Sequence, residues 1–546
     1  LPISDFRPLA GRKGGFLRFF REERIMHSDA ADLILRSDAI FTAARNELFS
    51  GYVVIKNGAI AAMIANGEDI QTWRGERTRF IELGDRLICP GFCDNHTFFT
   101  GYMSMQRGVD LHAARDSNHA LELLQDAEKL LPEGKSLYGW GWSAARWGAV
   151  PDARLLDDAF PQRPVVAIND DKSYCWMNRA AVELYGFTAE ECSAEARIAL
   201  LDEMLSDTAQ LKKEMRAFMA RLAGQGITAI KDVCFNDAPQ LMNAWDELEK
   251  EDALLLRVSI VSQPVSAPVD LAFGDQARRR FHSPWLRFHG FKFMVDGVIA
   301  DHTGDMIYPY ADRPGTNNER PVDYNALRQQ VLLADARGFN CCMNAEGDAA
   351  IRRCIDIFAE CRKRHPQSVV RHSLSDLECP HPNDIPRMAE LGLFAEVYAQ
   401  ILLLNPCEAE AYMRERYGEE REAQFYDYAA LFGAGVTVTI GTDLPLFIPS
   451  VPDSMYAACS RQFPDGSPVN GWYRERGMTR QQLLTAWTLN SARHHGMEEM
   501  TGSLEPGKRA DIAVFDRNLL SCPNDELRTS TVVLTLVDGR ITHDLL

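Results

Sequence analysis

The stretch ICPGFCDNHTFF, residues 88–99, is an apolar run that turns polar at Asp94 and His96. Seven later runs have the same form, and stretches with helical spacing of apolar residues separate them. Alternating strands and helices predict βα units around a parallel sheet, and eight such units predict a (β/α)8, or TIM, barrel of the α/β class. The predicted strands lie in residues 88–96, 226–232, 254–261, 287–296, 340–346, 369–376, 393–398 and 436–443.

Both ends of the chain have a different character, with short alternating strands joined by tight turns. Asn57-Gly58 near one end and Asp538-Gly539 near the other are typical of two-residue hairpin turns. We therefore predict a small β-sandwich domain assembled from both termini, beside the barrel domain. The predicted bounds are 1–87 with 500–546 for the β-sandwich and 88–499 for the barrel.

The composition limits the partners that the protein can have. The 546 residues include 59 Lys and Arg against 77 Asp and Glu, a formal net charge of −18. So acidic a chain is not typical of proteins that bind nucleic acid or anionic membranes, and we expect a small-molecule partner. No apolar run reaches the roughly 18 residues of a membrane-spanning helix. The 13 cysteines form no CxxC pair, which favours a reduced, cytoplasmic protein over a disulfide scaffold.

Short motifs along the barrel region resemble those of the amidohydrolase superfamily, in the same order. Residues 88–99 resemble its strand-one motif PGFxDxHxH, and residues 488–516 resemble the segment that returns the chain to the β-domain. The branch that they resemble is the YtcJ-like group, which includes N-substituted formamide deformylase. The resemblance implies an enzyme that hydrolyses a C–N bond of amide or formamide type in a small organic molecule, and it suggests a homodimer. The other matching stretches are GFKFMVDG at 290–297, NAEGDAAI at 344–351, RHSLSD at 371–376 and IGTDLP at 440–445.

The resemblance implies a metal site at the mouth of the barrel, and this sequence departs from the family at the ligands. The family binds a divalent metal with histidines, a lysine that is often carboxylated and an aspartate, and the metal activates a water molecule. The positions that keep the family residue are His96, Lys292 and Asp443. The positions that depart are Phe98, Asn344 and Asp376, where the family has histidines.

Three interpretations of this site remain open. In the first, His96, Asp376 and Asp443, with Asn344 beside them, hold one divalent metal, which could be Zn, Mn or Mg. Their oxygen ligands suit Mn²⁺ or Mg²⁺ better than Zn²⁺. In the second, there is no metal, Lys292 is a plain amine, and His96 and Asp443 exchange protons beside Asp376 and Asn344. That equipment suits metal-free hydrolysis, or a lyase or isomerase that eliminates, hydrates or decarboxylates. In the third, the protein is an inactive relative that binds a ligand. Hydrolysis is the leading prediction.

Residues 136–178 add two apolar runs to the eight, and we predict that they form an insertion over the barrel mouth. Their sequence GWGWSAARW resembles a family element that lines the substrate pocket. Long loops after barrel strands also often close over a pocket. The predicted substrate-binding residues are Trp142, Arg146 and Trp176 in the insertion, Glu346 after the fifth strand and His302 in the loop 301–321.

Overall fold

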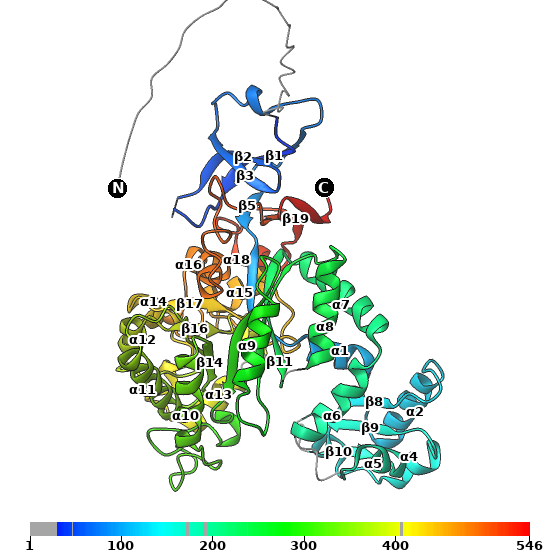
Figure 1. The fold of residues 1–546 in the computed structure, drawn as a ribbon. Coiled ribbons are helices and arrows are strands. Elements are labelled where there is room, and N and C mark those ends of the chain that lie inside the picture. The colour runs from blue at the N-terminus through cyan, green and yellow to red at the C-terminus, as the bar shows by residue number, and fades with distance from the viewer. Residues whose placement is uncertain (1–29, 46, 171–173, 189–193, 237, 405–407) are drawn as a thin grey trace, which may run out of the picture.

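The computed structural model describes residues 30–546, apart from residues 46, 171–173, 189–193, 237 and 405–407. Figure 1 shows three parts. A terminal β-domain lies at the top, a barrel wrapped by helices lies in the middle, and a small insertion lies at the lower right.

Eight parallel strands form the wall of the barrel, and they lie side by side in chain order from β6 to β17. An isolated parallel bridge between Thr97 and Leu444 brings the end of the barrel back to its beginning. Each predicted run overlaps one of these strands, so the prediction of a TIM barrel is confirmed. The strands are β6 (Phe92–Thr97), β11 (Ile227–Phe235), β12 (Arg257–Gln263), β13 (Leu286–Met294), β14 (Asn340–Asn344), β15 (Ser373–Ser375), β16 (Phe394–Val397) and β17 (Thr437–Ile440).

Helices cover the outside of the barrel because each presents an apolar stripe to the strands. Trp245 on α8 and Trp487 are among the largest fully buried side chains in this shared core. The helices of the barrel region and the segment after it are α1 (Phe99–Arg107), α7 (Thr208–Ala223), α8 (Pro239–Lys250), α9 (Leu271–Arg280), α10 (Tyr324–Ala336), α11 (Asp348–Arg364), α12 (Ile385–Leu391), α13 (Glu408–Tyr417), α14 (Tyr428–Gly433), α15 (Val451–Met455), α16 (Arg480–Thr485), α17 (Ser491–His494) and α18 (Asn524–Leu527).

The terminal β-domain joins the two ends of the chain, because β5 pairs antiparallel with β18. Side chains alternate along β1, so that Leu33 and Leu35 enter one apolar cluster and Ile34 enters another. The terminal domain is thus one continuous sheet with an apolar cluster on each face, where the sequence predicted a sandwich of two sheets. Its strands are β1 (Leu33–Ile40), β2 (Phe49–Lys56), β3 (Ala59–Ala65), β4 (Arg79–Glu82), β5 (Leu87–Pro90), β18 (Ile512–Phe515), β19 (Val532–Val537) and β20 (Arg540–Asp544).

The insertion is a four-stranded sheet in the order β10-β9-β8-β7, with helices and apolar clusters of its own. It begins at Val109, earlier than the predicted residue 136, because the chain leaves the barrel directly after α1. Figure 1 shows it on the side of the barrel away from the terminal domain, where the barrel strands end. Its elements are β7 (Val109–Asp110), β8 (Leu137–Trp142), β9 (Val165–Asn169), β10 (Cys175–Met177), α2 (Ser117–Glu128), α3 (Ala144–Trp147), α4 (Arg154–Ala159), α5 (Arg179–Tyr185) and α6 (Ala194–Leu205).

Two findings bear on the predicted surroundings of the protein. None of the helices in the described part of the chain is long and apolar enough to cross a membrane. The described cysteines have free thiols except Cys175, which is disulfide-bonded. The disulfide of Cys175 therefore departs from the prediction of a reduced protein.

A buried ion pair ties the barrel to the terminal domain. The Arg257 guanidinium on β12 donates hydrogen bonds of 2.7 and 2.9 Å to the two carboxylate oxygens of Asp511, which precedes β18. Both side chains are only 2% exposed. A charge buried this deeply is stable only with its partner in place.

Arg257→Met should therefore destabilise the whole protein. It leaves the Asp511 carboxylate buried without its partner, which costs about 3–5 kcal/mol. Urea unfolding followed by circular dichroism measures the change in the free energy of unfolding. Arg313→Met is the matched control, because Arg313 pairs with Glu319 on the surface and such pairs contribute about 0–1 kcal/mol. Equal effects of the two substitutions would contradict this account of the interface.

Candidate active site

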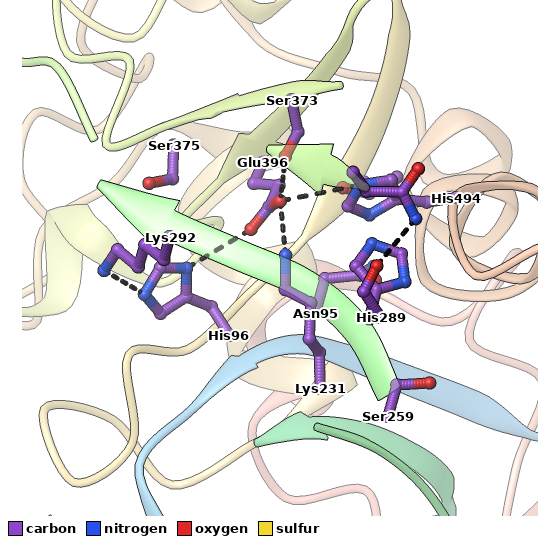
Figure 2. Close-up of polar contacts among 12 residues, drawn as sticks. Asn95, His96, Lys231, Ser259, His289, Lys292, Ser373, Ser375, Glu396 and His494 are labelled. Atoms are coloured by element: carbon purple, nitrogen blue, oxygen red, sulfur yellow. Dashed lines mark hydrogen bonds and ion pairs between the residues drawn. The ribbon is translucent and has the colours of Figure 1, made fainter. Parts of the chain in front are cut away.

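His96 lies at the centre of the polar residues inside the barrel and has no exposed surface. Its Nδ1 lies 3.3 Å from Oε2 of Glu396 on β16, and its Nε2 lies 2.7 Å from Nζ of Lys292 on β13 (Figure 2). A carboxylate only accepts hydrogen bonds and a lysine only donates them. The proton of a neutral His96 therefore sits on Nδ1, and the lone pair of Nε2 faces Lys292.

Glu396 supplies a fixed negative charge next to Nδ1 of His96. It forms an ion pair with Lys231 on β11, accepts a 2.6 Å hydrogen bond from Ser373 Oγ, and lies 3.7 Å from Nε2 of His494 (Figure 2). Burial alone would raise the pKa of Glu396, but the charge of Lys231 and the hydrogen bond from His96 hold that pKa well below its ordinary value. The carboxylate is therefore ionised, and it orients the imidazole above it.

Asp443 is the carboxylate beside His96 that reaches the mouth of the barrel. Its Oδ1 lies 3.7 Å from His96 Nε2, and its side chain is 31% exposed whereas that of His96 is fully buried. The residue follows β17 with φ at 49°, a left-handed conformation that aspartate tolerates better than most residues. Asp94 helps to fix this geometry, because its Oδ1 accepts hydrogen bonds from the backbone N–H groups of both His96 and Thr442, each 3.1 Å long.

The other two predicted site residues lie at the ends of neighbouring strands. Asn344 is the last residue of β14 and is buried. Asp376 follows β15, has φ at 64°, and accepts a 2.8 Å hydrogen bond from Ser375 Oγ. Among the residues that the structure describes, no third His, Cys, Asp or Glu ligand atom comes close enough to those of His96 and Asp443 to complete a three-ligand metal site. His96, Asp376 and Asp443 therefore do not by themselves form such a group in the described part of the chain.

One group with metal-ligand chemistry lies elsewhere, on the flank of the barrel, and consists of Asp335, Cys361 and His372. The backbone N–H of Cys341 donates a 3.1 Å hydrogen bond to Nδ1 of His372. Nε2 must then carry the proton of the neutral ring, and it donates to Asp335 at 3.1 Å. This hydrogen-bonding pattern leaves no lone pair on His372 for a metal.

A cluster of carboxylates occupies the mouth on the side of β14 and β15. Burial and the negative charges of Glu378 and Asp376 raise the pKa of Glu346 well above its ordinary value. Burial also raises the pKa of Glu378 to about 7, and the charge of Asp376 acts in the same direction. Each carboxyl is held in place by a hydrogen bond. Glu346 Oε2 accepts one of 3.1 Å from the Ile299 backbone N–H, and Glu378 Oε1 accepts one of 3.0 Å from the Tyr426 hydroxyl.

The predicted substrate-binding residues take different positions. Glu346 lies in the carboxylate cluster of the mouth. Trp142 and Trp176 are fully buried in the core of the insertion and donate to backbone carbonyls, so they offer no surface to a substrate here. Arg146 donates to the backbone carbonyls of His112 and Gly141 within the same insertion. His302 is buried in its loop, with Nε2 2.9 Å from Asp312.

A sequence profile described as the amidohydrolase family matches residues 79–543. The protein belongs to the amidohydrolase family. It is 22% identical over 544 residues to the protein LONG AFTER FAR-RED 3 of Arabidopsis thaliana, with 93% of this chain and 91% of that protein covered. It is 22% identical over 548 residues to the N-substituted formamide deformylase of Arthrobacter pascens, with 94% and 98% covered.

Solved structures show the same fold. An uncharacterized metal-dependent hydrolase from Pyrococcus horikoshii matches this amidohydrolase with a TM-score of 0.74 and 18% identity, over 90% of this chain and 99% of its own. Family membership and the hydrolases among its relatives support a hydrolytic role.

Sequence reasoning missed Lys231, Glu396 and His494, which complete the polar centre of the amidohydrolase barrel. The signal was present, because Lys231 interrupts the apolar run of β11 and Glu396 interrupts that of β16. A charged residue inside a strand that is buried on both faces needs a partner on a neighbouring strand. Pairing Lys231 with Glu396 from the sequence alone would have required the barrel geometry that brings β11 and β16 together across its interior.

Glu378→Gln should stabilise the protein at alkaline pH. The pKa of Glu378 is about 7 in the folded protein against an ordinary value of 4.5, so the native state binds more protons between these pH values and stability falls as pH rises through them. The glutamine keeps an acceptor for Tyr426 without the charge. We expect the free energy of unfolding to rise by about 1–3 kcal/mol at pH 8 and to change little at pH 4.5.

Urea unfolding at the two pH values measures this difference. Glu390→Gln, on the exposed side of α12, is the control and should show no such pH dependence. A Glu378→Gln variant that is less stable than the wild type at pH 8 would mean that a positive charge already neutralises this carboxylate.

Proposed function

We propose that this protein hydrolyses a C–N bond of amide or formamide type in a small organic molecule, and that it does so without a metal bound by three protein ligands. The observation that supports the proposal most strongly is the arrangement at His96. Glu396 holds the imidazole at Nδ1. On the other side of the ring, Nζ of Lys292 lies 2.7 Å and Oδ1 of Asp443 lies 3.7 Å from Nε2. Asp443 as a base and Lys292 as a hydrogen-bond donor therefore meet at Nε2 of an imidazole that Glu396 holds in place.

Asp443 is the general base in this mechanism. Its carboxylate takes a proton from a water molecule, and the hydroxide attacks the carbonyl carbon of the substrate. The carbonyl electrons move to oxygen and give a tetrahedral oxyanion. The protonated Asp443 then gives its proton to the nitrogen of the leaving group, the C–N bond breaks, and the products are an acid and an amine.

Lys292 stabilises the oxyanion in this scheme. One N–H bond is directed to His96, which leaves the other donors of the amino group for the substrate oxygen. The ring of Phe98 lies 5.1 Å from Nζ and shields that side of the group. Preorganised donors in a site that excludes water are worth about 10²–10³-fold in rate each.

One observation favours a second candidate, a metal-independent lyase or isomerase. Lys292 is buried in the barrel against the Phe98 ring, and a lysine amine in a pocket of this kind can form a Schiff base with a carbonyl substrate. Borohydride reduction in the presence of small aldehydes and ketones, followed by mass spectrometry, distinguishes the two. A reduced adduct on Lys292 supports the lyase, and its absence together with amide hydrolysis supports the hydrolase.

Asp443→Asn should lower kcat for amide or formamide hydrolysis by about 10²–10⁴-fold, because a general base contributes that much. The assay is a panel of small formamides and acetamides with detection of the released amine. Asp126→Asn is the matched control, since Asp126 lies on the surface of α2 in the insertion with Lys129 as its partner. The control should keep the activity of the wild type.

The same assay in the presence of a chelator tests the metal-free part of the proposal. We expect unchanged turnover after chelation and no gain from added Zn²⁺ or Mn²⁺. Activity that is lost on chelation and restored by about one equivalent of metal would contradict the metal-free mechanism and support the metal interpretation. A folded protein that turns over no compound of the panel, with or without metal, would favour an inactive ligand-binding relative.

A further inference from the structure

We propose that Gln263 is a specificity-determining residue that accepts a hydrogen bond from the N–H of the scissile amide, so that secondary amides are substrates and tertiary amides are poor ones. This inference rests on the proposed function and deepens it by naming the class of amide. Gln263 is the last residue of β12, and its side chain is only 5% exposed.

The strand register places the side chain of Gln263 inside the mouth of the barrel. Lys231 on β11 faces the interior, because it pairs with Glu396 across the barrel. Side chains alternate along a strand, so Phe235, four residues further along β11, lies on the same face. Phe235 is the register partner of Gln263 on β12, as Lys231 is that of Ser259. Gln263 therefore faces the interior at the end where the active site lies.

The neighbour of Gln263 on its other side is Lys292. Ser262 pairs with Phe291 on β13, and the next residues along the two strands are Gln263 and Lys292. Neighbouring strands lie about 4.8 Å apart. An amide whose carbonyl oxygen is bound by Lys292 therefore has its nitrogen within reach of the Gln263 side chain.

The side chain of Gln263 holds an acceptor that the fold does not use. Its Oε1 is buried and has no hydrogen-bond partner in the part of the chain that the structure describes. The backbone of the same residue is paired, because its carbonyl oxygen accepts a 2.8 Å hydrogen bond from the N–H of Asn236. Buried polar atoms of native proteins are rarely left unpaired, since this costs free energy. The N–H of a bound secondary amide would supply the missing donor.

The surroundings of this acceptor are aromatic. The rings of Phe98 and Phe235 stack with 5.4 Å between their centroids and 22° between their planes, and both residues are half-buried. Phenyl rings exclude water from the space beside Gln263, and a hydrogen bond is electrostatically stronger in such a place than in water. The same rings suit an apolar substituent on the nitrogen of the substrate.

A matched pair of formamides tests the proposal. The secondary member is N-(2-phenylethyl)formamide, and the tertiary member is N-methyl-N-(2-phenylethyl)formamide, which has no N–H. We expect kcat/KM of the secondary member to exceed that of the tertiary member by about 10–100-fold in the wild type, because the tertiary member leaves the acceptor unpaired.

Substitutions connect this preference to Gln263. Gln263→Leu keeps the approximate volume of the side chain without the acceptor, and it should remove the preference. Gln263→Glu keeps an acceptor oxygen and should keep the preference. Gln125→Leu on the exposed surface of α2 is the matched control and should leave the ratio of the wild type.

Three kinetic outcomes would overturn the inference. Equal kcat/KM for the two formamides in the wild type would do so while leaving the proposed hydrolysis intact. A preference that survives in Gln263→Leu would mean that the shape of the pocket excludes the additional methyl group. An equal loss of kcat for both formamides in Gln263→Leu would make Gln263 a donor to the oxyanion instead.

Calorimetry with two probes that resist hydrolysis separates failure of this inference from failure of the proposed hydrolysis. The probes are N-(2-phenylethyl)methanesulfonamide and methyl 3-phenylpropyl sulfone, which differ only in an N–H that is replaced by a methylene. We expect the sulfonamide to bind the wild type about tenfold more tightly and the two probes to bind Gln263→Leu equally. That result would support the role of Gln263 even if no formamide is hydrolysed. Equal affinity of the wild type for both probes, or no binding of either, would overturn the inference.

Discussion

The buried ion pair between Lys231 and Glu396 is the interaction on which the polar interior of this barrel depends. It lies across the barrel between β11 and β16, and neither side chain is exposed to solvent. Either charge alone would be strongly unfavourable there. Together they leave an ionised carboxylate that accepts a hydrogen bond from His96, with 3.3 Å between Nδ1 and Oε2 of Glu396. The direction of the His96 lone pair, and so the place where Lys292 and Asp443 meet, follows from this one pair.

The mouth above this pair has two chemically different sides. His96, Lys292 and Asp443 form one side, where a base and a donor flank a fixed imidazole. Glu346 and Glu378 form the other, where burial and the negative charge of Asp376 raise the pKa values of both carboxyls. Perturbed carboxyl groups of this kind cluster at functional sites because they are unfavourable for the fold alone.

The sequence predicts the barrel well and the site in part. Eight apolar runs with polar ends predict eight parallel strands, and His96, Lys292 and Asp443 do come together. The aromatic residues Trp142 and Trp176 were expected in the pocket but lie inside the insertion, because an aromatic pattern does not distinguish a pocket wall from a core. The Lys231–Glu396 pair spans 165 residues of sequence, and only the closure of the barrel brings the two side chains together.

A crystal structure with anomalous data collected above the zinc and manganese edges tests the central claim most directly. The account predicts Lys292 as an unmodified amine within hydrogen-bonding distance of His96 Nε2, a Glu396 carboxylate on the opposite nitrogen, and no anomalous peak between His96 and Asp443. A metal bound to both His96 and Asp443, with a carboxylated Lys292 as a further ligand, would contradict it. The site would then work as a remodelled metal centre, and the roles given to Lys292 and Asp443 would have to be assigned anew.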